Sequence, residues 1–270
     1  MKGKIILCVV ILITIAIGII VALNLETNQE GNSLERILNK GTFILGLDDS
    51  FPPMGFRNEN NEIIGFDIDL AKEVCKRLGV ELILQPISWT AKEQELNSYN
   101  IDCIWNGMSV NEERKEKMSL SKSYLKNSMC FVIKEDNTII SLEELSNKKV
   151  GVQSGSTAEE ILKESEMYGQ LKEVVAYTEN LTAFMDLEIN QIDAVFLDNV
   201  VANYYISTNN KPYKVLTDTL ADEEYAIGFR KQDIELCNKV NEILKEMKQD
   251  GTLEKISIKW FGKDTTIIGE

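Results

Sequence analysis

Three charged residues of this chain are of the kinds that together bind a zwitterion. Arg114 carries a planar guanidinium, which can hold a carboxylate through two parallel hydrogen bonds. Asp198 offers a carboxylate to an ammonium group, and Asp48 offers another to a polar or cationic side chain. A free amino acid carries all of these groups, so the three residues suit an amino acid as ligand.

Several uncharged residues could contact other parts of an amino acid. Thr157 lies in a turn, 154–157, where a predicted strand passes into a helix, and the free N–H groups of a helix start attract anions. Phe51 and Trp89 are flat apolar side chains that can cover the aliphatic part of a ligand. The loop 106–109 follows another predicted strand and comes shortly before Arg114.

Taken singly, each of these residues has a simpler interpretation. The run 112–117 is strongly charged and by itself is typical of a solvated helix face. Thr157 can be only a helix cap, the two aromatic residues only core, and the two aspartates only turn residues. A shared site is favoured because each residue lies at a strand end or a helix start, where open α/β sheets bind ligands.

The elements that must position these residues alternate between strand and helix in both halves of the chain. The spacing of Phe66, Leu70, Val74 and Leu78 predicts an amphipathic helix. Thr157 and Glu160 are expected to form a capping box at the start of another. Segments 96–105 and 187–196 resemble each other, which favours two similar α/β lobes over chance. The predicted strands are 43–47, 80–87, 101–105, 149–153 and 194–197; further helices are predicted at about 91–98, 180–189 and 234–247.

Composition excludes several classes of function. The net charge of −14 disfavours non-specific nucleic-acid binding, which depends on Lys and Arg. The chain has no histidine, which removes the Ser-His-Asp and Cys-His catalytic arrangements and the commonest zinc ligand. Its five cysteines include no CxxC pair and mostly lie in apolar stretches, so we expect free buried thiols. No cofactor or metal ion is expected.

The first segment, 1–33, is predicted to be an export signal or anchor followed by a polar tether. Lys2 and Lys4 precede an apolar run, 5–23, that is just long enough to cross a bilayer. The run is long for a removable signal, so we expect an uncleaved signal-anchor, with a cleaved signal peptide as the alternative. Either one places the rest of the chain at the outer face of the cytoplasmic membrane, in the periplasm or outside the cell.

Four motifs in order resemble the bacterial extracellular solute-binding proteins, family 3, the binding components of ABC importers for polar amino acids. The resemblance covers about 34–264 and rests on segments 65–70, 107–115, 149–157 and 251–262. It implies an α/β, two-lobed periplasmic-binding-protein fold, in which each lobe is a mostly parallel sheet flanked by helices.

The resemblance also implies how the lobes divide the chain and what the site residues do. The large lobe would comprise 34–129 plus 226–264 and the small lobe 130–225, with two hinge strands near 127–131 and 223–227. Arg114 would bind the ligand carboxylate with help from Ser109 and Thr157, and Gly107 and Asp198 would hold the ammonium. Ser154 is also expected among the ligand-binding residues. Phe51 and Trp89 would enclose the ligand stem, and Asp48 would read the ligand side chain.

The implied partners are an L-amino acid and the membrane subunits of the importer, with the protein itself a monomer. Because the candidate site has acidic groups and a single arginine, we expect a neutral polar or cationic ligand rather than aspartate or glutamate. Two alternatives remain open. One is an enzyme that resembles prephenate and arogenate (cyclohexadienyl) dehydratases, with Asp48 or Glu93 as proton donor. The other is a surface sensor of amino acids.

Overall fold

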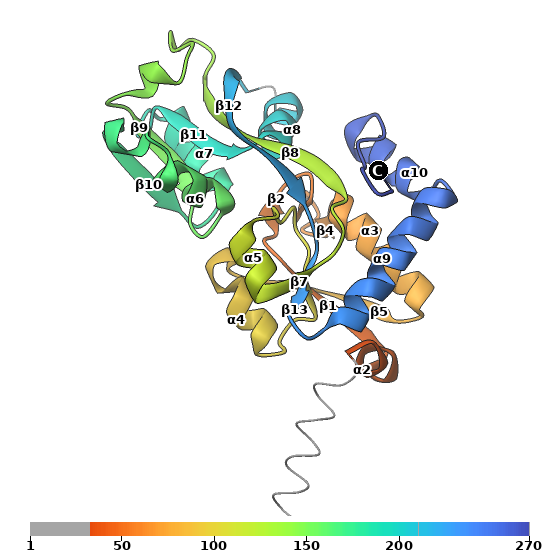
Figure 1. The fold of residues 1–270 in the computed structure, drawn as a ribbon. Coiled ribbons are helices and arrows are strands. Elements are labelled where there is room, and N and C mark those ends of the chain that lie inside the picture. Colours follow the sequence, from red (N-terminus) through yellow and green to blue (C-terminus); the bar gives the residue numbers. More distant parts are fainter. Residues whose placement is uncertain (1–32, 210, 270) are drawn as a thin grey trace, which may run out of the picture.

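Two five-stranded sheets, each flanked by helices, form the two lobes of the molecule (Figure 1). The computed structural model describes residues 33–209 and 211–269. Within these ranges no helix is long and apolar enough to cross a membrane. The predicted anchor and nearly all of the predicted tether lie outside the described residues, and Ser33 already belongs to the helix α2 (Ser33–Lys40).

The sheet of the large lobe has the order β5-β1-β6-β13-β7. Strands β5, β1 and β6 are parallel, and β13 alone runs against its neighbours. The sheet is therefore mostly parallel, as predicted. Its strands are β1 (Thr42–Leu47), β5 (Glu81–Pro86), β6 (Cys103–Ile104), β7 (Met118–Leu120) and β13 (Gly228–Arg230), and its helices, besides α2, are α3 (Phe66–Leu78), α4 (Lys92–Asn97), α5 (Glu112–Lys117), α9 (Ile234–Gln249) and α10 (Thr252–Phe261).

The sheet of the small lobe repeats this plan in the order β10-β9-β11-β8-β12. Here β10, β9 and β11 are parallel, and β8 is the strand that runs against its neighbours. The similarity of the two sheets confirms the predicted pair of α/β lobes. The strands are β8 (Leu125–Lys134), β9 (Lys149–Gln153), β10 (Glu173–Tyr177), β11 (Ala194–Asp198) and β12 (Tyr213–Tyr225), and the helices are α6 (Thr157–Glu164), α7 (Asn180–Glu188) and α8 (Asn199–Asn209).

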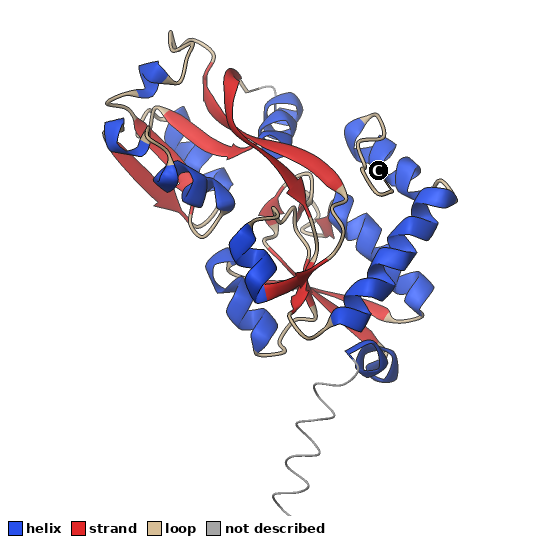
Figure 2. Cartoon of the chain, viewed as in Figure 1, coloured by secondary structure: helices blue, strands red, loops and turns tan. Residues whose placement is uncertain are grey.

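Two antiparallel strands connect the lobes. The chain leaves the large lobe between β7 and β8 and returns to it between β12 and β13, and β8 and β12 lie side by side in the middle of the molecule (Figures 1 and 2). They pair from Leu125 with Tyr225 onward, with Asn127 opposite Glu223. A small sheet of β2 (Ser50–Phe51), β3 (Gly55–Arg57) and β4 (Ile63–Ile64) follows β1.

The amphipathic helices bury the faces that their spacing predicted, with one exception. In α3, Phe66, Leu70 and Val74 are fully buried. In α9 the residues from Cys237 to Met247 with helical spacing are buried, but Ile234, predicted to share that face, is 56% exposed. Because Ile234 is the first residue of α9, no preceding helical turn covers it. The four described cysteines are buried free thiols, as expected: Cys75, Cys103, Cys130 and Cys237.

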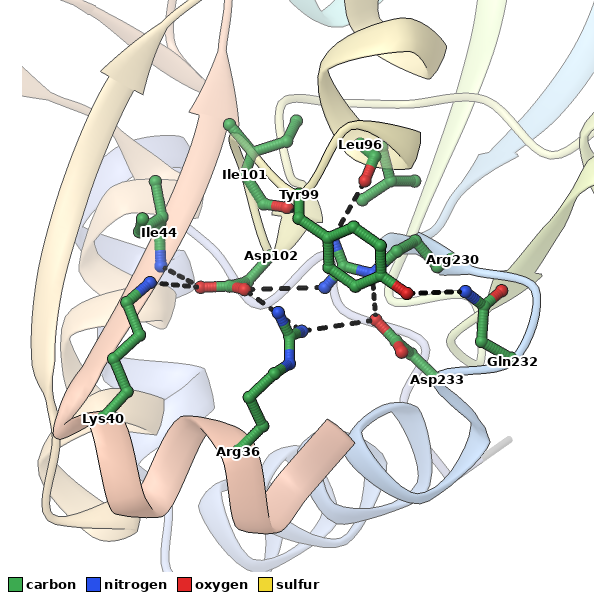
Figure 3. A network of polar contacts seen from close by, with 10 residues as sticks. All are labelled: Arg36, Lys40, Ile44, Leu96, Tyr99, Ile101, Asp102, Arg230, Gln232 and Asp233. Carbon is green, nitrogen blue, oxygen red and sulfur yellow. Dashed lines mark hydrogen bonds and ion pairs between the residues drawn. The ribbon is translucent and has the colours of Figure 1, made fainter. Parts of the chain in front are cut away.

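A buried ionic network fastens α2 to the base of the large lobe (Figure 3). Arg230 is completely buried, donates to the backbone carbonyls of residues 96 and 101, and pairs with Asp233 at 2.7 Å. Asp102 accepts from the Ile44 N–H at 2.9 Å and is approached by Arg36 of α2 at 3.4 Å. Arg36 and Lys40 of α2 both approach the buried Asp102, and these ion pairs tie α2 to the base of the lobe.

Candidate functional site

A narrow pocket lies between the two lobes. Its walls come from the strand ends and helix starts of both sheets, the location expected for ligand sites in open α/β sheets. The residues that line it are Asp48, Phe51, Trp89, Asn106, Gly107, Ser109, Arg114, Met129, Gln153, Ser156, Thr157 and Asp198.

Arg114 is the buried cation of this pocket. Asn111 caps α5 by accepting from the Arg114 N–H at 2.8 Å, which fixes the arginine in the first turn of the helix. Arg114 is 3% exposed, and its Nη1 donates to the Ser109 carbonyl at 2.7 Å. Burial lowers the pKa of the guanidinium and nearby carboxylates oppose this, but arginine stays charged. Its remaining N–H groups can therefore hold a carboxylate in the pocket.

Asp198 is the matching buried anion, at the end of β11. Its Oδ1 accepts from the Tyr225 hydroxyl at 2.6 Å and from Asn127 Nδ2 at 2.8 Å. Both bonds go to Oδ1, so Oδ2 can accept from a ligand ammonium. Burial raises the pKa of Asp198 to about 6, against the lowering effect of these hydrogen bonds and of Arg114. The group is therefore mostly ionised at neutral pH.

Asp48 meets the opposite lobe through Gln153. Its Oδ1 accepts from the N–H and the hydroxyl of Ser50, and its Oδ2 accepts from Gln153 Nε2 at 2.6 Å. Gln153 ends β9 in the small lobe and also donates to the Thr178 carbonyl. This amide–carboxylate pair is therefore a polar contact across the two lobes at the pocket wall.

The capping of α6 differs from the prediction by one residue. Ser156, not Thr157, is the N-cap: its Oγ accepts from the Glu159 N–H at 3.2 Å, and the Glu159 carboxylate accepts from the Gly155 N–H at 2.7 Å. Thr157 is thus the first helical residue, and its buried Oγ1 has no hydrogen-bond partner. An unpaired buried hydroxyl in a pocket wall is suited to bind a ligand.

The buried carboxylate of Asp67 holds the loop 106–109, which follows β6. Asp67 is completely buried, and its Oδ2 accepts from the Gly107 N–H at 2.7 Å and from the Tyr124 hydroxyl at 2.9 Å. Burial raises the pKa of Asp67 to about 7, and the two hydrogen bonds lower it. The sequence placed Asp67 at the amino end of a helix. In the structure Asp67 also binds the Gly107 N–H and so holds this loop in place.

Apolar side chains complete the pocket. Phe51 and Trp89 are 6% and 8% exposed and come from β2 and from the 3₁₀ turn η1 (Trp89–Ala91). Met129 of β8 adds a third apolar side chain. The pocket wall therefore includes flat apolar surfaces.

Eight of the nine residues singled out from the sequence line this one pocket, and Ser154 does not. The Ser154 N–H continues the sheet by donating to the Tyr177 carbonyl, and the chain turns toward the pocket only after Gly155. Four further lining residues were not proposed: Asn106, Met129, Gln153 and Ser156. The sequence could have indicated two of them: Gln153 ends a predicted strand, and Ser156 lies beside Thr157 in the predicted turn.

The chain is similar to known amino acid-binding proteins over most of its length. The L-cystine-binding protein TcyJ of Escherichia coli (strain K12) is 30% identical over 253 residues, which are 93% of this chain and 94% of the relative. The arginine-binding extracellular protein ArtP of Bacillus subtilis (strain 168) is 36% identical over 225 residues, 82% of this chain and 87% of the relative.

A solved structure supports the same relationship at the level of the fold. The substrate-binding protein of an ABC uptake transporter from Streptococcus pneumoniae, with bound histidine, has a TM-score of 0.85 and 36% sequence identity and covers 87% of this chain and 98% of its own. The family model described as bacterial extracellular solute-binding proteins, family 3, matches residues 43–263. The chain therefore belongs to the bacterial extracellular solute-binding proteins of family 3.

Proposed function

We propose that this protein is the extracytoplasmic binding component of an ABC importer and closes on a polar L-amino acid, with cationic amino acids preferred. The observation that carries the proposal is the meeting of Arg114 and Asp198 in one buried pocket between the lobes. A guanidinium and a carboxylate complement the two charged groups that every free amino acid has. The relatives that bind arginine and histidine support the same class of ligand.

The preference for a cationic side chain follows from the other charge that lines the pocket. Asp48 is buried, and the side chain that faces it from the small lobe is the neutral Gln153. Arg114, Asp198 and Asp48 together carry one excess negative charge, which a ligand with a cationic side chain would balance. An acidic ligand would place a carboxylate beside Asp48 without a second lining arginine, which disfavours binding.

Closure is expected to couple binding to transport. Hydrogen bonds already cross between the lobes in this structure: Gln153 donates to Asp48, and Lys92 Nζ donates to the Gly155 carbonyl at 3.0 Å. A ligand that contacts both lobes would favour this closed arrangement, which the importer would recognise. We place the hinge where β8 and β12 pair, near 127–131 and 223–227, with the lobes as 34–129 plus 226–264 and 130–225.

We propose no catalytic step in the pocket and no role as a sensor. Glu93, considered as a proton donor, does not line the pocket and pairs with Lys117 on the surface of the large lobe. Asp48 accepts hydrogen bonds from Ser50 and Gln153 and donates none, so it is arranged as an acceptor for a ligand side chain rather than as a proton donor. The predicted signal-anchor, a location outside the cytoplasmic membrane and a monomeric state remain part of the proposal.

Calorimetric titration of the purified protein with single amino acids tests this function. We expect arginine, lysine or another polar amino acid to bind, and Arg114→Ala to weaken binding by more than about 100-fold, since breaking a buried charge pair costs about 3–5 kcal/mol. Lys115→Ala, which changes the adjacent exposed cation, should bind as the wild-type protein does. Tight binding of glutamate without arginine, lysine or glutamine would contradict the ligand class, and no binding of any amino acid would contradict the function.

A further inference from the structure

With an amino acid bound, the hydroxyl of Ser109 would have two competing acceptors. Ser109 lines the pocket beside Arg114 and is 4% exposed, so its hydroxyl is placed to donate to a ligand carboxylate. In this structure the same hydroxyl donates instead to Glu223 Oε2 at 2.8 Å. A serine hydroxyl has one proton. While Glu223 is ionised, Ser109 can therefore present only lone pairs to the ligand, and these repel a carboxylate.

Glu223 lies where the two lobes are joined. It belongs to β12, opposite Asn127 of β8, and is partly buried. Asn127 Nδ2 lies 2.8 Å from Asp198 Oδ1 and 3.4 Å from Glu223 Oε2, so one amide serves two carboxylates. Glu223 is thus connected both to the Ser109 that faces the ligand carboxylate and to the Asp198 that faces the ammonium.

Burial, more than the surrounding charges, favours the neutral form of Glu223. Burial and the neighbouring Asp198 raise its pKa to about 7, against the hydrogen bonds from Ser109 and Asn127 and the charge of Arg114. The other ionisable side chains at this place are those of Lys126 on β8 and of Asp222 and Glu224 on β12, and all three are exposed.

We propose that Glu223 takes up a proton when the amino acid binds, and that this proton turns the Ser109 hydroxyl toward the ligand carboxylate. The proton comes from solvent and forms an O–H on Glu223. That O–H donates to Ser109 Oγ, and the Ser109 proton then donates to the ligand. Glu223 thereby acts as a positioning residue, and the inference rests on the proposed function because it requires a ligand carboxylate beside Ser109.

The affinity for the amino acid should fall as pH rises above the pKa of Glu223. Below the pKa of Glu223 the proton is already present and binding needs no uptake. Above it each binding event must take up a proton, so affinity falls as pH rises, at most tenfold per pH unit. Asp198, with a pKa of about 6, is already ionised above pH 7 and adds little there.

Calorimetry at pH 7.5 in two buffers of different ionisation enthalpy counts the protons taken up on binding. We expect about half a proton or more for the wild-type protein and none for Glu223→Gln, whose amide N–H donates to Ser109 permanently. Glu223→Gln should also bind more tightly than the wild-type protein at pH 8.5. Glu224→Gln, the exposed neighbour on the same strand, should keep the wild-type proton uptake. Ser109→Ala should lose the uptake although it keeps Glu223.

Each outcome decides the proposal. Binding by the wild-type protein without proton uptake overturns it, and so does an uptake that persists in Glu223→Gln, which would assign the proton to another group such as Lys92. If Glu223→Gln does not fold, an uptake that persists in Ser109→Ala overturns it equally. Failure of the proposed function looks different, because the wild-type protein would then bind no amino acid at any pH.

Discussion

Gly107 shows how a single residue can be required for both the fold and the pocket. Its φ is +56°, a conformation that side chains disfavour. A Cβ at this position would lie 2.9 Å from Phe51 Cε1 and 3.2 Å from Tyr225 Cε2. Phe51 lines the pocket and Tyr225 orients Asp198, so a side chain at residue 107 would disturb two parts of the site.

We expect Gly107→Ala to lower stability by about 2–4 kcal/mol, from backbone strain and crowding together, and to weaken ligand binding. Gly79→Ala is the matched control, because Gly79 has φ of +74° but open space around its Cα. Urea unfolding of both variants separates strain from crowding. Equal losses in the two variants, or undiminished ligand binding by Gly107→Ala, would show that contact with Phe51 and Tyr225 is unimportant.

The types of the site residues could be predicted from the sequence, but their partners could not. Asp48 and Gln153 both follow from predicted strand ends, yet they are 105 positions apart and meet only because the lobes close on each other. Thr157 was assigned the cap that Ser156 provides, because both residue types cap helices and the sequence alone does not say where the turn ends.

At the scale of elements, the starts of α4 and α6 bring the two lobes together. Lys92 of α4 is 6% exposed, and its Nζ donates to the Gly155 carbonyl in the turn before α6. Burial, with Arg114 nearby, lowers the pKa of Lys92 to about 8, so the group is still largely charged at neutral pH. It is not among the residues that line the pocket, so it acts on closure without touching the ligand.

We therefore expect Lys92→Met to weaken amino acid binding by about threefold to tenfold, the loss of one hydrogen bond that favours the closed state. Methionine keeps an apolar stem beside Trp89 but also loses the 3.3 Å hydrogen bond from Lys92 Nζ to the Trp89 carbonyl. Titration calorimetry measures the affinity, and Lys72→Met, a change at an exposed position of α3, is the control. Unaltered affinity in Lys92→Met would mean that this contact does not contribute to closure.

Helices were easier to predict than short strands. The 3.6-residue period predicted α3 and α9 because each buries one continuous face. The predicted strand 101–105 instead shortens to two residues, Cys103–Ile104, because the chain then leaves the sheet to form the loop above Asp67. A departure of this kind depends on tertiary contacts, and the local apolar pattern does not record it.

At the scale of the whole molecule, buried acids set the response to pH. Asp67 and Glu223 have pKa values raised to about 7 and Asp198 to about 6, in each case mainly by burial. The sequence predicted two lobes and an acidic chain of net charge −14. It did not predict which carboxylates are buried, since Asp67 and Asp69 have the same helical context and only Asp67 points inward.

Stability should therefore decrease as pH rises from about 4 to 7. Because their pKa values are higher in the folded than in the unfolded chain, these acids favour folding fully below pH 4 and cease to do so as pH passes through 6 to 7. Urea unfolding across this range, in high salt to screen the surface charges, measures the slope. Asp67→Asn, which can still accept from Gly107 and Tyr124, should flatten it. Asp69→Asn, on the same helix and paired with Lys259, is the control for removing a charge from α3. Equal slopes in the wild-type protein and Asp67→Asn would mean that Asp67 is ionised throughout, held in that form by its two donors.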